Sequence, residues 1–476
     1  MLQKIQKLFG AQDMTVGSPT KNIAKFAIPL LIGNLAQQLY ATVDSVVVGK
    51  YCSVELNGYT GVDALAAVGA SGPIINLLLV LFVAISTGAG ILVAQYFGAR
   101  DRERLSHCIG TSVILITVTS LMIMAVGIPL AGPLLRAINT PEVYFDLARA
   151  YLVIIFAGIL GGGFYNIISG ILRGMGDSFY PLVFLIVSAA MNIILDIVFV
   201  ANLRMGVHGV ALATILSQAV SAVLCLVRLA HMKDTITLNR KSLTPNVKMG
   251  SQVLKLGLPS GITQAVFSLA MVFVQSLTNQ MGDFVPAISV AVMRVDGFAM
   301  MPNFTFGLAI STYIGQNIGA GRQDRIKPGE RACLKLSLIV STLLVICLVL
   351  WGGNLIDLFI NAETTSPDVY EKVVSIGTRA LRILAVGYLA MAITQVYGGI
   401  LRAAGDTVSP MVISIVTTVV VRIPVAYAAA YFTRSAEWPH GHPDALFISL
   451  LVSWLLGAAL TYFRFRQGKW KEIKLV

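Results

Sequence analysis

Residues 171–177 read Ile171-Leu172-Arg173-Gly174-Met175-Gly176-Asp177, and residues 400–406 read Ile400-Leu401-Arg402-Ala403-Ala404-Gly405-Asp406. Five of the seven positions are identical, and each Asp is followed four residues later by a proline, Pro181 or Pro410. The offset is 402 − 173 = 229 residues, close to half of the 476-residue chain. This repeat predicts that the chain is built from two similar halves.

Three further pairs of segments recur in the same order along the chain. Gln95-Tyr96-Phe97-Gly98-Ala99 recurs as Gln316-Asn317-Ile318-Gly319-Ala320, an offset of 316 − 95 = 221 residues. The other two pairs are Thr140–Tyr144 with Ser366–Tyr370, and Lys25–Pro29 with Lys255–Pro259. Four matches in one order exceed what a shared apolar composition produces, so the repeat extends over both halves.

The composition indicates a membrane protein. Hydrophobic residues make up 56% of the chain and charged residues 12%, against about 25% charged residues in soluble domains. Apolar blocks such as Val113–Leu130 and Leu336–Leu350 have about the length that a helix needs to cross a bilayer. The alternating pattern of an outer-membrane barrel is not seen. We therefore expect an all-α polytopic membrane protein.

Gly, Pro and charged residues divide the chain into about twelve predicted spans. In the first half we expect spans at residues 23–49, 64–97, 108–130, 142–172, 179–201 and 207–229. In the second half we expect spans at residues 252–281, 284–318, 332–355, 367–401, 408–433 and 444–465. This gives an N-terminal six-helix lobe at 1–230, a linker at 231–250 and a C-terminal six-helix lobe at 251–476.

The basic residues predict the orientation. Lys and Arg gather at the N-terminus and in the loops after even-numbered spans, for example at Arg100, Arg102 and Arg104. Both termini and the linker are therefore expected in the cytoplasm, and this topology explains the net charge of +12 better than a nucleic-acid partner does. Because each half has an even number of spans, the lobes should be parallel repeats around a central cavity. The basic N-terminus lacks the apolar core of a removable signal peptide.

No motif of a known energy-coupling or catalytic site is present in the sequence. There is no P-loop, and no hydrolase elbow, HExxH or protein-kinase signature. The five cysteines show no metal or redox spacing and are expected to pack as small apolar residues. We therefore expect a carrier without cofactors, not an enzyme, that is driven by an ion gradient.

The stretch Met191-Asn192-Ile193-Ile194-Leu195-Asp196-Ile197-Val198-Phe199-Val200 puts an acid inside the fifth predicted span. A carboxylate there costs roughly 3 kcal/mol on insertion scales, and Asn192 lies on the same helical face four residues earlier. Asp44 in the first span and Thr214 in the sixth are expected at about the same depth, in the outer half of the membrane. Two carboxylates at one depth can share a proton or hold a small hard cation.

One alternative interpretation and one observation bear on this cation-site hypothesis. Asp44 and Asp196 could each be satisfied separately by backbone or hydroxyl groups, which leaves a structural alternative open. In the second half, the position that matches Asn192 is Val421, and Asp196 matches Val425 or Ala426. The cation chemistry is therefore expected in the first half alone.

Other polar and adaptable side chains within the spans are candidates for a substrate cavity. They are Asn34, Gln37, Gln264, Asp296, Met300 and Gln395, and ordinary helix packing is the alternative for each. Asp296 has a possible partner in Arg422, so a buried ion pair and a contact with substrate are both open. Arg173 with Asp177, and Arg402 with Asp406, flank the repeated turns, where we expect them to cap and pin the chain; a role in substrate binding is the alternative.

Taken together, Val43–Gly49, Ala66–Gly69, Val93–Ala99 and the two turns resemble the multidrug and toxic compound extrusion (MATE) family, over about residues 21–465. The resemblance is to the prokaryotic DinF-like branch. It implies a cation site formed by Asp44, Asn192, Asp196 and Thr214, where H⁺ or Na⁺ would bind. Other branches carry acids on the seventh and tenth helices, and none occurs here in Leu258–Met281 or Leu384–Leu401.

The resemblance also implies a function. We expect a monomeric antiporter in the bacterial inner membrane that exports amphipathic, often cationic, drugs or toxic metabolites in exchange for H⁺ or Na⁺ by alternating access. Its partners would be small-molecule substrates and the lipid bilayer, with no nucleic acid. A flippase for lipid-linked oligosaccharides is the alternative within the superfamily, and a membrane receptor or enzyme is the alternative outside it.

Overall fold

The computed structural model of the chain describes residues 12–52, 58–232, 235–237, 242, 244–282, 284–359 and 367–475. Within the first helix, the side chains of residues 39–46, 48 and 49 lie outside this description. The described residues form helices joined by short turns and contain no strand. The fold is therefore all-α, as predicted.

The helices of the first half are α2 (Pro19–Tyr51), α4 (Gly61–Gly98), α5 (Arg102–Ala137), α6 (Glu142–Gly174), α7 (Phe179–Asp196) and α8 (Gly206–Ala230). Those of the second half are α9 (Val247–Gln280), α10 (Val285–Gly319), α11 (Ile326–Asp357), α12 (Pro367–Ala403), α13 (Val408–Ile415), α14 (Arg422–Phe432) and α15 (Asp444–Arg466). Two π-helical segments, η1 (Ile197–Asn202) and η3 (Val416–Val421), extend α7 and join α13 to α14. The 3₁₀ turns η2 (Gln323–Arg325) and η4 (Lys469–Glu472) lie before α11 and after α15.

Each of the twelve predicted spans corresponds to one helix or one continuous helical run. Among the described residues, eleven runs are long and apolar enough to cross a membrane, and α2 has 33 residues, or about 50 Å at 1.5 Å per residue. The third span was predicted too short, since α5 starts at Arg102 and ends at Ala137. It starts early because Asp101 caps it by accepting a hydrogen bond from the Arg104 N–H at 2.9 Å.

The outer helix faces fit a lipid environment. Many large apolar side chains are exposed on these faces, among them Val118, Leu121, Leu343 and Leu350 at 52–64%, and water-soluble monomers rarely expose large apolar patches. Of the five cysteines, none is in a disulfide bond, and four are buried while Cys347 is exposed.

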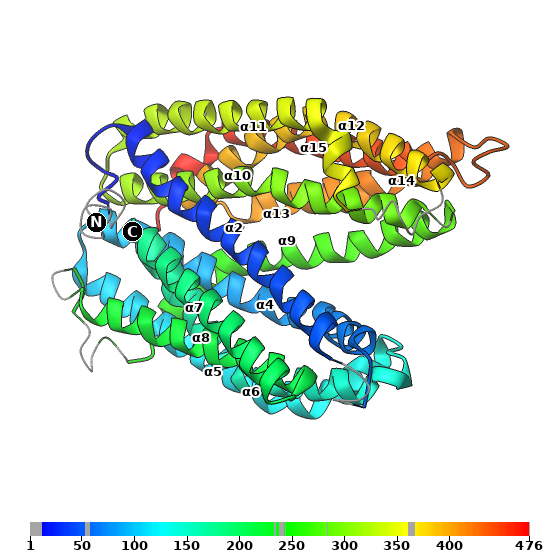
Figure 1. The fold of residues 1–476 in the computed structure, drawn as a ribbon. Helices are drawn as coiled ribbons and strands as arrows, with labels where there is room; N and C mark the ends of the chain where they lie inside the picture. Colours follow the sequence, from blue (N-terminus) through cyan, green and yellow to red (C-terminus); the bar gives the residue numbers. More distant parts are fainter. Residues whose placement is uncertain are drawn as a thin grey trace.

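The two halves repeat one packing scheme. In the first half α6 packs against α4, α5 and α8, and in the second half α12 packs against α10, α11 and α15. Figure 1 shows the two groups of helices as two lobes that approach one another at the end where both chain termini lie. We call this end, which carries residues 12–18 and 467–475, the terminal face.

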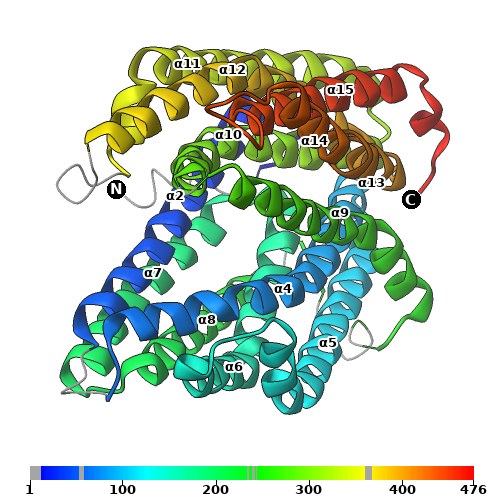
Figure 2. The ribbon, with the colours of Figure 1, turned by 90° about the vertical axis from the view of Figure 1, so that its right-hand side faces the viewer.

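The first helix of each half also packs on the other lobe. α9 packs along α4, and α2 packs along α10 and α11 as well as along α7 of its own half. Figure 2 shows α2 and α9 on opposite sides of the junction between the lobes. Two helices therefore join the lobes. α2 belongs to the first half and packs on the second lobe, and α9 belongs to the second half and packs on the first lobe.

The contact between α4 and α9 depends on glycine. A Cβ atom on Gly88 would lie 2.0 Å from the carbonyl oxygen of Val253, and one on Gly257 would lie 1.8 Å from that of Ala84. Gly257 and Gly261 are four residues apart on α9, the spacing that lets two membrane helices approach backbone to backbone. This close packing holds the two helices together inside the bilayer, where the hydrophobic effect does not drive helix association.

Replacing Gly88 with Ala should therefore destabilise the protein. Overpacking of this kind costs about 1–3 kcal/mol, so we expect a lower melting temperature for Gly88→Ala in detergent, measured by tryptophan fluorescence. Gly69→Ala, on the same helix, is the matched control, because a Cβ at Gly69 meets no atom within 4 Å. Equal melting temperatures for the two variants would contradict the assigned contact.

Candidate functional site

A cavity near the lobe junction has a volume of about 780 Å³, within the usual range for small-molecule sites. Its walls come mainly from α9, α10, α12, α13, η3, α14 and α15, with additional residues of α4 and α6. Most of the wall therefore belongs to the C-terminal half.

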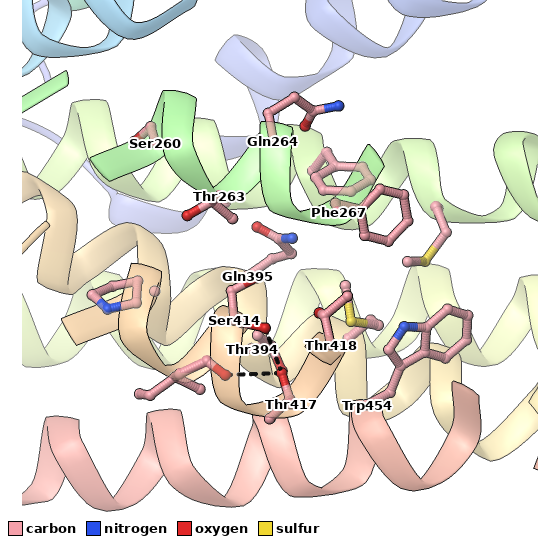
Figure 3. Close-up of a pocket in the computed structure, with 18 of the residues that line it drawn as sticks. Ser260, Thr263, Gln264, Phe267, Thr394, Gln395, Ser414, Thr417, Thr418 and Trp454 are labelled. Carbon is pink, nitrogen blue, oxygen red and sulfur yellow. Dashed lines mark hydrogen bonds between the residues drawn. The ribbon is translucent and has the colours of Figure 1, made fainter. Parts of the chain in front are cut away.

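The wall combines apolar, amide and hydroxyl side chains. Figure 3 shows Gln264 and Phe267 on α9, Gln395 on α12, and Trp454 on α15, with hydroxyl groups between them. Methionines add deformable surface, namely Met271, Met293, Met300, Met391 and Met411. Flexible thioethers and scattered polar groups can accommodate ligands of different shapes.

Four of the six residues predicted for a substrate cavity line this one, namely Gln264, Asp296, Met300 and Gln395. Asn34 and Gln37, on α2, are not among its lining residues. The Asn34 side-chain amide instead donates to the Thr305 hydroxyl of α10 at 3.1 Å. Because α2 lies against the opposite lobe, Asn34 contributes to the junction between lobes. The role of the four lining residues in substrate binding stays a prediction.

The ion pair between Asp296 and Arg422, one of the two interpretations that the sequence leaves open, is not formed. Asp296 accepts a hydrogen bond from the Tyr388 hydroxyl at 2.9 Å, and Arg422 Nη1 donates to the Met271 sulfur at 3.6 Å. Arg422 is only 4% exposed, and both charged groups line the cavity. Contact with substrate remains the open interpretation for both residues.

The repeated turns are built differently from the prediction. The two aspartates do cap the following helices, since Asp177 accepts from the Tyr180 N–H and Asp406 from the Ser409 N–H, each at 3.1 Å. Their ion pairs, however, are with arginines from the last turns of α8 and α15. Arg228 Nη2 lies 3.3 Å from the Asp177 carboxylate.

Arg464 Nη2 lies 2.8 Å from the Asp406 carboxylate in the second half. Arg173 and Arg402 therefore do not pin the turns as predicted, because helices distant in sequence bring another guanidinium to each carboxylate. Burial raises the pKa of Asp177, and its hydrogen bond from Tyr180 and the Arg228 guanidinium oppose that rise. The aspartates thus hold the turns without the arginines that flank them in sequence.

Arg173 and Arg402 line the cavity instead. In the part of the chain that the structure describes, no hydrogen bond or ion pair joins either guanidinium to another residue, and Arg173 Nε is buried. Each lies in the last turn of its helix, where the helix dipole stabilises a cation by about 0.3–1 kcal/mol.

The predicted cation residues lie in the other lobe. Asn192 and Asp196, in the last turns of α7, are 0% exposed, and Thr214 on α8 is 8% exposed. The Ser188 hydroxyl donates to the Ser217 carbonyl at 2.9 Å and joins α7 to α8. The Asp44 side chain lies outside the described residues. The structure thus brings the three predicted helices α2, α7 and α8 into contact, with buried polar groups on α7 and α8, and the cation site stays a prediction.

π-helical turns, which sequence reasoning missed, adjoin both charged residues. η1 begins directly after Asp196, and η3 ends directly before Arg422. Such turns are rare and often accompany functional sites. The equivalent helices of the two halves therefore carry opposite charges beside a locally widened helix.

Between the lobes at the terminal face, two repeated motifs make reciprocal contacts. Gln95 Nε2 donates to the Ala403 carbonyl at 2.7 Å, and Gln316 Nε2 donates to the Gly174 carbonyl at 3.0 Å. A Cβ on Gly98 or Gly319 would lie 1.9 Å from the Gln316 or Gln95 carbonyl oxygen, respectively. We call these residues the seam. Their repetition was visible in the sequence, but their contact was not.

The N-terminal segment closes over the seam. The Met14 N–H donates to Gln316 Oε1 at 2.9 Å, the Asn317 amide donates to the Met14 carbonyl at 3.2 Å, and Met14 is 0% exposed. On the other side, the Gln12 N–H donates to the Gly176 carbonyl at 3.2 Å. Residues 12–14 thus bind both lobes at once.

Replacing Gln316 with Leu should open the seam, because it removes two hydrogen bonds and leaves buried backbone groups unpaired. Unpaired groups cost about 1–3 kcal/mol each, so a Met14→Cys reporter in a background without native cysteines should react with a thiol reagent at least about tenfold faster. Gln323→Leu, which alters an exposed glutamine at the same face, should leave the rate unchanged. Equal rates for both variants would show that the Gln316 contacts do not hold the seam.

Comparison with known proteins agrees with the repeat and the fold. The MatE family model matches residues 29–198 and again residues 259–428, an offset of 259 − 29 = 230 residues. The probable multidrug resistance protein YpnP of Bacillus subtilis is 31% identical over 466 residues, which cover 98% of this chain and 99% of that protein. The probable multidrug resistance protein NorM of Thermotoga maritima is 26% identical over 460 residues, 95% of this chain and 93% of that protein.

Solved structures share the whole fold. A crystal structure of MATE in complex with MaL6 has a TM-score of 0.86 at 24% identity and covers 97% of this chain and 99% of that one. An outward-facing structure of a multidrug resistance MATE family transporter gives the same TM-score, identity and coverage. The chain therefore belongs to the multidrug and toxic compound extrusion (MATE) family of membrane transporters.

Proposed function

We propose that this protein is a secondary active antiporter that exports amphipathic compounds in exchange for H⁺ or Na⁺. The observation that carries the proposal is the cavity of about 780 Å³ in a MATE-family fold, which is lined by mixed apolar and polar side chains, mostly from the C-terminal half. Its relatives include probable multidrug resistance proteins and a multidrug export protein of Staphylococcus aureus. Export, and a transport activity in place of an enzymatic one, follow from that family.

The driving ion would bind in the first lobe. Asp196 is a fully buried acid with Asn192 one turn away on the same helix, and Thr214 lies on the adjacent α8. Oxygen atoms of this kind suit a proton or a hard cation, and one charge that moves through about 100 mV releases about 2.3 kcal/mol. Asp44 on α2 would complete the group.

Transport would proceed by alternating access. We take the terminal face to be cytoplasmic, since basic loops lie there, so that closure of the seam corresponds to an outward-open state. Cation binding at Asp196 would then favour release of substrate and separation of the seam, which requires only a difference in cation affinity between the two states. The protein would act as a monomer in a bacterial inner membrane. The flippase alternative is not favoured, because the YpnP and NorM relatives are probable multidrug resistance proteins.

Asp196→Asn should abolish gradient-driven efflux, because the amide cannot carry the charge that the ion neutralises. We expect purified variant in proteoliposomes to export a fluorescent dye no faster than protein-free vesicles, under a pH gradient and under a separate Na⁺ gradient. Asp146→Asn, at an exposed acid of α6 in the same lobe, should keep the native rate.

Gel filtration must show that both variants are folded and monodisperse. Native efflux by the Asp196 variant under both gradients would contradict the assigned coupling role. Efflux by the native protein that depends on one gradient alone would identify the ion.

A further inference from the structure

The cavity is electropositive, which bears on the chemistry of its ligand. Its lining includes four charged residues, the arginines Arg173, Arg402 and Arg422 and the single acid Asp296. Asp296 accepts a hydrogen bond from Tyr388 and makes no ion pair with Arg422. With all four groups ionised, the described lining carries three positive charges against one negative charge.

Two of these arginines occupy equivalent positions of the repeat. Arg173 ends α6 of the first lobe and Arg402 ends α12 of the second, so each lobe contributes one guanidinium to the end of the cavity nearest the terminal face. Their neighbouring aspartates cannot neutralise them, because Asp177 and Asp406 are paired with Arg228 and Arg464. Within the part of the chain that the structure describes, these two cations therefore face the cavity without a protein counterion.

The surroundings of the pair fit one class of ligand. A guanidinium offers several N–H donors in a planar fork that matches the oxygens of a carboxylate, sulfonate or phosphate. Beyond the pair, the cavity wall is rich in apolar groups, including Phe267, Met300 and Trp454. An acidic head group at the arginines with an apolar body against this wall would use both features.

We propose that Arg173 and Arg402 together bind the acidic head group of an amphipathic organic anion, and that such anions are substrates of this protein. The inference rests on the proposed transport function and names its substrate class. It departs from the cationic compounds that the family resemblance led us to expect.

The site also adjoins the seam. The carbonyl groups that accept the seam hydrogen bonds belong to Gly174 and Ala403, each one residue after an arginine of the pair. A head group held by both arginines therefore bridges the two lobes beside the contacts that must separate during transport. Binding of the anion is accordingly sensitive to whether the seam is closed.

The test uses two fluorescent probes with one aromatic body and opposite head groups, pyrene-1-sulfonate and 1-pyrenemethylammonium. Binding is measured by fluorescence anisotropy in phosphatidylcholine nanodiscs. We expect the native protein to prefer the sulfonate. The double variant Arg173→Met and Arg402→Met, which keeps much of the apolar stem, should weaken sulfonate binding at least about tenfold and leave ammonium binding unchanged or stronger.

Arg149→Met on α6 and Arg382→Met on α12 are the matched controls, since both arginines are exposed; they should not change either affinity. Arg173→Lys with Arg402→Lys should restore part of the sulfonate affinity, because a lysine keeps the charge but loses the fork. If phosphatidylglycerol in the nanodiscs competes with the sulfonate for the native protein, the acidic head group bound at the two arginines can also be a lipid phosphate.

Unchanged sulfonate affinity in the folded double variant, or equal losses for both probes, would overturn the inference. Measuring the efflux of both probes from proteoliposomes distinguishes a failure of the anion-site proposal from a failure of the transport proposal. Arginine-dependent binding without gradient-driven efflux would refute transport but retain the anion site. Gradient-driven export of the ammonium probe with arginine-independent sulfonate binding would refute the anion site but retain transport.

Discussion

Close backbone contact at glycine is the constraint on which the arrangement of the lobes depends. At Gly88 and Gly257 the helices α4 and α9 are so near that a single methyl group would overlap a carbonyl oxygen. The same holds for Gly98 and Gly319 at the seam. Helices gain little from the hydrophobic effect inside a bilayer, so such contacts and a few hydrogen bonds must join the lobes. A junction of this kind can separate without exposing a large apolar core.

The two halves share a fold but differ in charge at equivalent helices. α7 ends in a buried acid at Asp196, whereas the corresponding run α13–η3–α14 carries a buried cation at Arg422. The repeat therefore conserves the helices and the turn caps at Asp177 and Asp406, and leaves the membrane-embedded charges free to diverge. This divergence separates the candidate ion site, in one lobe, from the cavity, mostly in the other.

Features set by local sequence were predictable, and those set by contacts across the fold were not. The twelve spans follow from apolar length and helix punctuation, and the caps at Asp177 and Asp406 follow from a carboxylate placed before a helix. The ion pair of Asp177 with Arg228, 51 residues later, and the hydrogen bond of Asn34 with Thr305 depend on tertiary packing. The π-helical turns also escaped prediction, since they change which carbonyl accepts each hydrogen bond but not the apolar pattern.

The separation of ion site and cavity makes α2 the element through which they can communicate. α2 packs along α7 and η1, which adjoin Asp196, and along α10, which carries Asp296 and Met300 of the cavity wall. Its N-terminal extension, at Met14, binds Gln316 of the seam. Coupling through a protein requires an element whose position both sites influence. Any rearrangement of α7 would act on α2, and α2 with its N-terminal extension contacts both the cavity-lining helix α10 and the seam.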